Sequence, residues 1–253
     1  MFIHFLLVLN RIIFTGQSFD MTTNKKKTVK KTKNSTKTKI TRDSVIAAYM
    51  SYILENGERP KSIYKFTTDN GMEERDFYTF FGSFEGLREE IWVSFHQNTI
   101  KVLDRDKGYE SYPNKEKMLA YFYTFFELLT ANRSYVLFTL SETENNLKNL
   151  KQLRKLRHEI KDYASDLIEQ GNEDKNFRLA KNPVTIFSEG AWLQTLFLLK
   201  YWKDDNSANF EQTDVAIEKS VKAIFDVFET APLESVFDFG KFLFKNHFAS
   251  ARH

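Results

Sequence analysis

Residues 57–87, which read GERPKSIYKFTTDNGMEERDFYTFFGSFEGL, contain two short stretches with helical apolar spacing on either side of a glycine. The first stretch covers 62–70, Gly71 turns the chain, and Met72 begins the second. Apolar side chains recur every three or four residues in both, which is the period of one helix face. The apolar positions are Ile63, Phe66, Phe77, Phe80 and Phe81. The pattern predicts two short helices joined by a tight turn, the geometry of a helix-turn-helix unit.

Helical spacing continues on both sides of this stretch. Upstream it runs from residue 41 to Asn56, where Gly57 offers a C-cap, and downstream it covers 84–104. Further helices are predicted over 114–131, 133–143, 145–171, 184–203, 209–229 and 233–247. The sequence shows no competing strand pattern and no internal repeat. The predicted fold is therefore all-α, with a three-helix helix-turn-helix module followed by a larger helical bundle.

The composition suits this architecture. The chain has 253 residues, 42% of them hydrophobic, which is enough for a small module and a medium-sized domain. Its 4 prolines and 9 glycines fit long helices better than a turn-rich β fold. The predicted division is a disordered leader and lysine-rich tail over 1–40, the helix-turn-helix module over 41–92, and a helical domain over 93–250.

The positive charge of the chain is confined to its tail. Residues 25–39 contain eight lysines and no acid, while the rest of the chain has 29 basic and 34 acidic residues. The tail either keeps the chain in solution or grips phosphates or anionic lipid without specificity. Residues 1–14 are apolar but too short to span a bilayer. They indicate an upstream start or a non-native leader, or alternatively a signal or anchor.

Few residues offer catalytic or metal chemistry. The absence of cysteine excludes disulfides, thiol catalysis and thiolate metal sites, and it is compatible with a reducing, cytoplasmic location. The histidines are scattered, and the sequence has no glycine-rich phosphate loop. Four acids that could attract attention are predicted to lie on solvated helix faces: Glu142, Glu144, Asp162 and Asp166. We therefore predict no enzyme activity, no metal site and no cofactor.

The region around the glycine turn resembles the tetracycline-repressor (TetR) family of transcriptional regulators. The resemblance covers about 45 residues without a gap and is carried by Gly57, Phe66, Gly71-Met72, Tyr78, Phe80-Phe81, Ser83, Glu85 and Leu87. It implies a helix-turn-helix module that binds double-stranded operator DNA, followed by a domain for ligand binding and dimerisation. The DNA contacts that it implies are Lys61, Lys65, Thr67, Arg75, Tyr78 and Thr79.

The module departs from the family pattern in ways that concern DNA binding. Thr67 and Asn70 stand where the family usually has alanine, and Phe84 stands where relatives have a lysine that holds DNA phosphate. The reading helix starts with three acids and one base over 73–76, and 42–92 contains 6 basic and 10 acidic residues. Acids near the DNA backbone are repelled by it, although a carboxylate can accept a hydrogen bond from cytosine.

A second stretch is similar to another branch of the fold. Tyr201-Trp202, Asp205, Ser207, Phe210-Glu211 and Thr213 look like a segment shared by some TetR relatives and by the lipid-binding accessory proteins of ubiquinone biosynthesis. Those accessory proteins keep the fold, lose DNA binding and hold an isoprenoid lipid. This resemblance implies an alternative function, a lipid-binding accessory protein that assists a membrane-associated enzyme.

Aromatic and aliphatic faces suggest where a ligand and a partner bind. Six aromatic residues are predicted to line a pocket for an apolar ligand, with an ordinary core as the alternative: Phe122, Phe126, Tyr135, Trp192, Phe197 and Tyr201. The helices at 184–203 and 209–229 are apolar on more than one face, which predicts a homodimer or else a wholly intrachain bundle. The segment 233–248 is predicted to dock on the bundle, and membrane contact is not expected.

These inferences lead to one preferred function. We predict a dimeric one-component transcriptional regulator that binds operator DNA and responds to a small apolar ligand.

Overall fold

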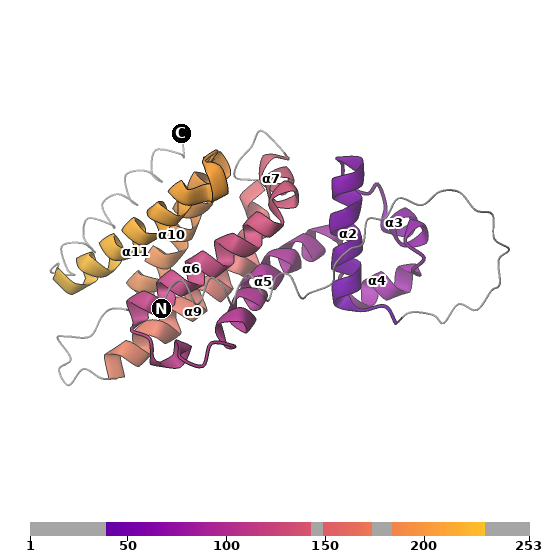
Figure 1. Cartoon of the computed structure of the whole chain (residues 1–253). Coiled ribbons are helices and arrows are strands. Elements are labelled where there is room, and N and C mark those ends of the chain that lie inside the picture. The colour runs from indigo at the N-terminus through magenta and orange to yellow at the C-terminus, as the bar shows by residue number, and fades with distance from the viewer. Residues whose placement is uncertain (1–38, 143–148, 174–183, 231–253) are drawn as a thin grey trace, which may run out of the picture. The chain divides into compact units, whose positions relative to one another are not determined.

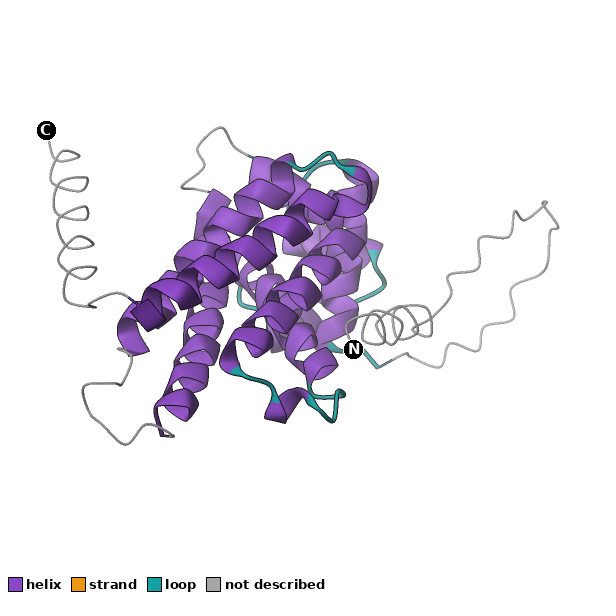
Figure 2. Cartoon of the chain, turned by 60° about the vertical axis from the view of Figure 1, so that its left-hand side comes forward, coloured by secondary structure: helices purple, strands orange, loops and turns teal. Residues whose placement is uncertain are grey.

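The computed structural model describes residues 39–142, 149–173 and 184–230. The chain divides after Thr41 into two units, and the account below concerns the second, which begins at Arg42. Within the described ranges every regular element is helical and no strand occurs, as Figure 2 shows. The predicted all-α fold is confirmed.

Three helices form the first part, which we call the head (residues 42–83), and a fourth helix follows it. They are α2 (Arg42–Asn56), α3 (Ile63–Asp69), α4 (Glu74–Phe80) and then α5 (Phe84–Leu103) (Figure 1). Gly57 and Gly71 have φ angles of 66° and 67°, a left-handed conformation that a residue without Cβ adopts without strain. Both glycines therefore turn the chain where the sequence predicts.

One boundary in the head differs from the prediction. The third helix was expected to begin at Met72, but α4 begins at Glu74. Met72 is buried, and its N–H donates to the carbonyl of Thr67 at 2.9 Å, so it completes the turn after α3 instead. The backbone N–H of Glu73 donates to the carboxylate of Asp76 at 2.9 Å, and this cap fixes the first residue of α4.

A cluster of four rings holds the head together. The ring of Phe66 lies 5.7 Å from that of Phe84, and the ring of Phe77 lies 5.5 Å from the same Phe84. Tyr49 of α2 completes the cluster, 5.4 Å from Phe84. Phe84, the first residue of α5, thus contributes to the core of the head.

The remaining helices form the second part, which we call the bundle (residues 84–230). They are α6 (Asn114–Ala131), α7 (Arg133–Ser141), α9 (Arg154–Glu173), α10 (Val184–Asp204) and α11 (Glu211–Thr230). α5 runs without interruption from the head into the bundle, where it packs on α6 and α9 (Figure 1). α10 packs on α9 and α11, and α11 packs on α6. The predicted domain boundary at residue 92 falls inside α5.

Residues 149–150 and 154–171 are α-helical, in agreement with the helix predicted over 145–171, but a 3-10 turn separates them. α9 begins only at Arg154, after a 3-10 turn over Lys151–Leu153, and residues 143–148 lie outside the described ranges. The amide of Asn149 donates to the carbonyl of Leu140 at 3.0 Å, and that of Gln152 donates to the carbonyl of Thr139 at 2.9 Å. These bonds satisfy carbonyls at the end of α7. The helix predicted over 233–247 also lies outside the described ranges.

Side chains fill the space between α5, α6 and α9. His96 bonds the hydroxyl of Tyr121 at 2.9 Å, and the ring of Tyr121 stacks on that of Tyr163 with centroids 4.5 Å apart. Burial lowers the pKa of His96 to about 4, so the imidazole is neutral at physiological pH. The centre of the bundle in this region is a packed polar-aromatic core.

The corner between α10 and α11 is held by one carboxylate. Asp205 accepts hydrogen bonds from the N–H and hydroxyl of Ser207, at 2.8 and 2.6 Å. It also accepts from the N–H and hydroxyl of Thr213, at 2.9 and 2.6 Å. Arg133 lies between the rings of Trp202 and Phe210, 4.5 and 4.4 Å from their centroids. The second stretch singled out in the sequence is therefore a structural lock on the α10–α11 corner.

Asp205→Ala should lower the free energy of unfolding by about 2 kcal/mol, because it removes the N-terminal cap of α11. Burial alone raises the pKa of Asp205, but the hydrogen bonds from Ser207 and Thr213 outweigh it and lower the pKa to about 2. The stabilisation is thus present above the ordinary pKa of 3.8 and is lost as the pH falls towards 2. Urea unfolding across this pH range measures the gap between wild type and variant, and Asp204→Ala serves as the neighbouring control.

Candidate functional site

Five of the six predicted DNA contacts lie on the surface of the head. They are Lys61, Lys65, Arg75, Tyr78 and Thr79, which belong to α3, α4 and the segment before α3. The sixth, Thr67, is buried, and its hydroxyl donates to the carbonyls of Ile63 and Tyr64 in its own helix. Thr67 is therefore unavailable to a phosphate in this arrangement, and its role is to complete α3.

The acids at the start of α4 are engaged within the head. Asp76 caps the helix, as described above, and Glu73 pairs with Arg75 at 2.9 Å. The carboxylate of Glu74 accepts a hydrogen bond from the hydroxyl of Tyr78 at 3.4 Å. Acids in the first turn also face the positive end of the helix dipole, so they stabilise α4. Their presence has a structural explanation independent of any role in DNA recognition.

Tyr64 is a surface residue of α3 that the sequence reasoning missed. Its side chain is 67% exposed, the most exposed large apolar residue reported for the head. It follows Ser62, whose hydroxyl accepts from the N–H of Lys65 at 3.2 Å and so caps α3. A tyrosine beside two lysines at a helix start can donate to a phosphate, so Tyr64 extends the candidate surface.

A network of arginines and a carboxylate joins the head to the bundle. Arg59, between α2 and α3, makes a two-pronged ion pair with Glu142 at the end of α7. Arg88 of α5 donates to the same carboxylate at 2.7 Å and to the side chain of Gln152 at 3.3 Å. The hydrogen bonds that Arg59 donates to Glu142 raise the pKa of Arg59 above its ordinary value. Glu142 is 13% exposed, so the prediction of a solvated carboxylate is wrong at this position.

The other acids in that prediction differ from Glu142. Asp162 is exposed and pairs with His158 at 3.2 Å, and Asp166 is also exposed. Glu144 lies outside the described residues.

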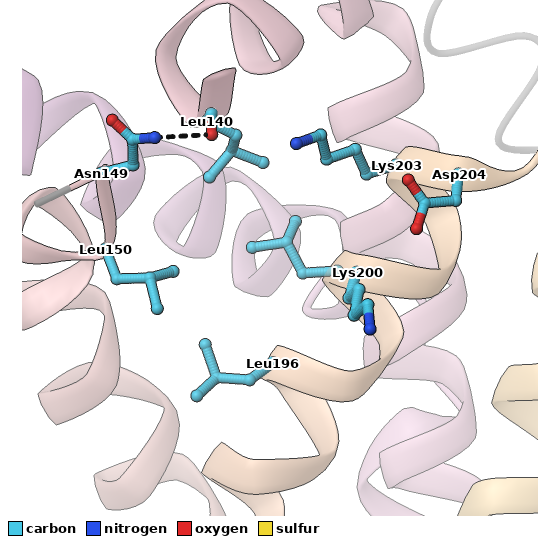
Figure 3. Close-up of a pocket in the computed structure, with 8 residues that line it drawn as sticks. Leu140, Asn149, Leu150, Leu196, Lys200, Lys203 and Asp204 are labelled. Atoms are coloured by element: carbon cyan, nitrogen blue, oxygen red, sulfur yellow. Dashed lines mark hydrogen bonds between the residues drawn. The ribbon is translucent and has the colours of Figure 1, made fainter. Parts of the chain in front are cut away.

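A cavity of about 310 Å³ lies between the end of α7, residues 149–150 and α10 (Figure 3). Its apolar wall consists of Leu140, Leu150, Leu196 and Leu199. Its polar lining consists of Asn149, Lys200, Lys203 and Asp204. Figure 3 shows the leucine side chains directed into the space and the charged groups gathered along the last turns of α10. The lining therefore combines four leucine side chains with two lysine ammonium groups.

The six aromatic residues predicted for a ligand are not gathered around this cavity. Phe122 and Phe126 are buried on α6, with ring centroids 6.5 Å apart, and Trp192 is buried on α10. Tyr135 is buried on α7, and its hydroxyl has no hydrogen-bond partner among the described residues. Phe197 and Tyr201 lie on the exposed side of α10. The structure therefore places four of them in the interior and two on the surface.

An apolar stripe runs along the exposed side of α10. It consists of Leu193, Phe197 and Tyr201, which are 64%, 51% and 37% exposed and recur every four residues. The neighbouring α11 exposes Val215 and Val227. Such a contiguous apolar strip is typical of a surface that another chain or segment covers.

Two other features, a cluster of metal-binding side chains and a membrane-spanning helix, are absent from the described residues. No group of three or more metal-binding side chains is present among them. No helix within the described ranges is long and apolar enough to cross a membrane.

Comparison with known proteins gives one match. Residues 117–243 match the family model described as the tetracyclin repressor-like C-terminal domain. This range includes α6 from Lys117 onward and all of α7, α9, α10 and α11, and with them the Asp205 corner and the cavity. No curated protein and no solved structure matches the chain.

Proposed function

The chain belongs to the tetracycline-repressor family of regulators, and from this premise we propose that it is a dimeric one-component transcriptional regulator. In this proposal the head binds operator DNA, and a ligand held in the bundle changes the affinity of the head for that DNA. The observation that carries the proposal is the exposed polar surface of α3 and α4, which rests on the aromatic core of the head. That arrangement suits a reading helix presented to the major groove.

Within the head, α4 is proposed to read bases while the approach to α3 holds phosphates. Arg75 and Tyr78 lie on α4 and are exposed, with Arg75 paired to Glu73 and the ring of Tyr78 5.7 Å from that of Phe77. Lys61, Tyr64 and Lys65 lie at the start of α3, where basic and hydroxyl groups fix the position of a protein on the duplex. Thr79 remains a proposed contact, although its hydroxyl also donates to the carbonyl of Arg75 at 2.9 Å.

The homodimer is proposed to form through the exposed stripe of α10, with α11 beside it. Three large apolar side chains at four-residue spacing match the requirement of a helix that packs against its symmetry mate. The Asp205 lock sets the angle between the two helices, which determines the shape of this face.

Phe197→Glu should weaken dimerisation by at least about tenfold, because a carboxylate would be buried against apolar side chains of the second copy. Sedimentation velocity over a range of concentrations measures the dissociation constant. Leu54→Glu makes the same kind of change on α2, where Leu54 is exposed, and should leave the dimer intact. An unchanged dimer in Phe197→Glu would place the interface elsewhere.

A response to ligand needs a connection between the bundle and the head. Leu140 and Asn149 line the cavity, and Asn149 also accepts a hydrogen bond from Gln152 at 2.7 Å. Gln152 bonds Arg88, and Arg88 shares Glu142 with Arg59 of the head. A ligand that binds one arrangement of this network more tightly than another would shift the position of the head. Tyr135, Phe122 and Phe126 remain proposed ligand contacts for a state in which the interior opens.

The proposal is tested by selecting DNA from a genomic fragment pool across a series of salt concentrations. The full chain is compared with a shortened chain that begins at Ile40, since residues 25–39 contain eight lysines. Selective retention of a few fragments by the shortened chain supports a regulator that reads sequence. Retention that is non-selective, or that disappears with residues 25–39, counts against it.

The alternative function is a lipid-binding accessory protein that does not bind DNA. The observation in its favour is the charge of 42–92, where 10 acids outnumber 6 bases, together with Phe84 in the core of the head. A co-purifying isoprenoid or acyl lipid, combined with failure of the DNA selection, would establish this alternative.

A further inference from the structure

The side of α10 that lines the cavity carries lysines as well as leucines. Leu196, Leu199, Lys200 and Lys203 recur at spacings of three and four and line the cavity. Lys200 is exposed and Lys203 is half-buried, so their ammonium groups lie at the solvent side of the leucine wall. Another side of the same helix is the apolar stripe described above. Two lysines beside an apolar wall point to a ligand that brings negative charge.

The two lysines differ from Lys155 and Lys161 of α9 in their partners. Lys155 pairs with Glu90 at 2.6 Å, and Lys161 pairs with Glu189 at 2.6 Å. Among the described residues, Lys200 and Lys203 make no ion pair within 4.0 Å. Asp204 supplies the one negative charge in the described lining, so the mouth keeps a net positive charge.

Apolar and charged groups of the lining differ in exposure. Leu140 and Leu199 are buried, Leu196 is half-buried, and Lys200 is exposed. Figure 3 shows Lys200, Lys203 and Asp204 on the last turns of α10, with the ammonium group of Lys203 extending towards Leu140. A volume of about 310 Å³ is at the lower end of small-molecule sites. That size favours one alkyl chain over a polycyclic compound or a two-chain lipid.

We propose that this cavity binds a single-chain anionic amphiphile, with its alkyl chain against the leucines and its carboxylate between Lys200 and Lys203. As the effector site of the regulator, the inference rests on the proposed function, but binding itself is measured without DNA. Each additional buried methylene should tighten binding by about fourfold until the cavity is full. The carboxylate adds charge-assisted hydrogen bonds to the two ammonium groups.

The test uses decanoate as the probe and calorimetric titration of the full chain. Decyltrimethylammonium, which has the same chain and the opposite charge, should bind at least about tenfold more weakly than decanoate. Octanoate should bind about 16-fold more weakly, because it lacks two methylenes. Equal binding of the anionic and cationic probes, or no saturable binding of decanoate, overturns the proposal.

Variants assign the site. Lys200→Gln with Lys203→Gln should weaken decanoate binding by at least about tenfold, whereas Lys219→Gln with Lys222→Gln on exposed positions of α11 should change it less than about twofold. Leu196→Trp should abolish binding by filling the cavity, with helical circular dichroism as the check on folding. If both lysine pairs behave alike, the carboxylate is not held at this mouth and the proposal fails.

Two further measurements, vesicle binding and DNA selection, distinguish the proposal from other results. Binding to phosphatidylglycerol vesicles that depends on Lys200 and Lys203, without binding of free decanoate, would mean a membrane surface and would overturn the proposal. Decanoate binding that depends on the two lysines, in a chain that selects no DNA, supports the ligand class while the proposed regulator fails. The DNA selection is therefore repeated with the lysine variant, which should retain the same fragments as wild type.

Discussion

Arg75→Glu together with Tyr78→Ala is expected to abolish selective operator binding, with a loss of affinity of at least about 100-fold. Arg75 and Tyr78 are exposed on the outer side of α4, where a reading helix meets base edges. The substitution removes two contacts and places another acid in a head that already carries 7 acids against 5 bases. Fluorescence anisotropy with a selected fragment, at fixed salt, measures the loss.

The fold of the head should survive this change. α4 is anchored by Phe77, which is fully buried, and by the cap between Glu73 and Asp76. Circular dichroism and the thermal midpoint therefore serve as checks. Lys222→Glu on α11 has the same charge change as Arg75→Glu at an exposed position of the bundle, and it should reduce affinity by less than about twofold. If the double variant keeps its affinity, α4 is not the reading helix.

Local signals in the sequence were sufficient for most of the head. Ser62 and Ser83 precede apolar spacing and act as N-caps, with the N–H groups of Lys65 and Gly86 as donors at 3.2 and 3.1 Å. Gly57 and Gly71 end the helices before them. The start of α4 was misplaced because Met72 reads as an apolar helix residue. Its burial belongs to the turn, and the Glu73–Asp76 cap decides the boundary.

The interrupted helix before α9 could not be predicted in the same way. Apolar periodicity over 145–171 is compatible with one continuous helix. The 3-10 turn over Lys151–Leu153 lies where Asn149 and Gln152 bond carbonyls of α7, which are contacts between elements. Sequence spacing shows which side of a helix is apolar, but not which side chain is needed by the end of another helix.

Sequence spacing predicts the candidate sites even less completely than it predicts the helices. Aromatic spacing identified Phe122, Phe126 and Trp192 as inward residues, and they are buried. Spacing alone does not reveal whether the facing helices leave a gap, so the cavity beside Leu196 and Lys200 was missed. The lysine pair Lys200 and Lys203, at helical spacing from Leu196 and Leu199, was the available signal.

The ion pair between the head and the bundle was not predicted because its partners are far apart in the sequence. Glu142 was placed on a solvated face because its sequence neighbours are polar. Its partner Arg59 is 83 positions away, and no local pattern links the two residues. Charged residues on polar faces are solvated in most proteins, and the exceptions depend on long-range packing.

Glu142→Ala should lower the free energy of unfolding by about 3 kcal/mol. The side chain of Arg88 is only 9% exposed, and without Glu142 its guanidinium would remain buried beside the neutral amide of Gln152. Arg59 would lose both prongs of its ion pair at the same time. Urea unfolding monitored by circular dichroism measures the change. Glu85→Ala is the matched control, because Glu85 is exposed and lies 3.9 Å from Arg59, and it should cost less than about 0.5 kcal/mol.

The same variant tests whether the network transmits a signal as well as stabilising the fold. If Glu142 couples the cavity to the head, the ratio of operator affinities with and without bound decanoate should approach one in Glu142→Ala, while decanoate still binds. A double-mutant cycle with Arg59→Ala separates the two contributions, since Arg88 keeps its carboxylate when only Arg59 is changed. Loss of stability with an unchanged ratio would restrict Glu142 to a structural role. If the ratio also approaches one in Arg59→Ala, the transmission is assigned to the Arg59–Glu142 pair, because this pair is the part of the network that enters the head.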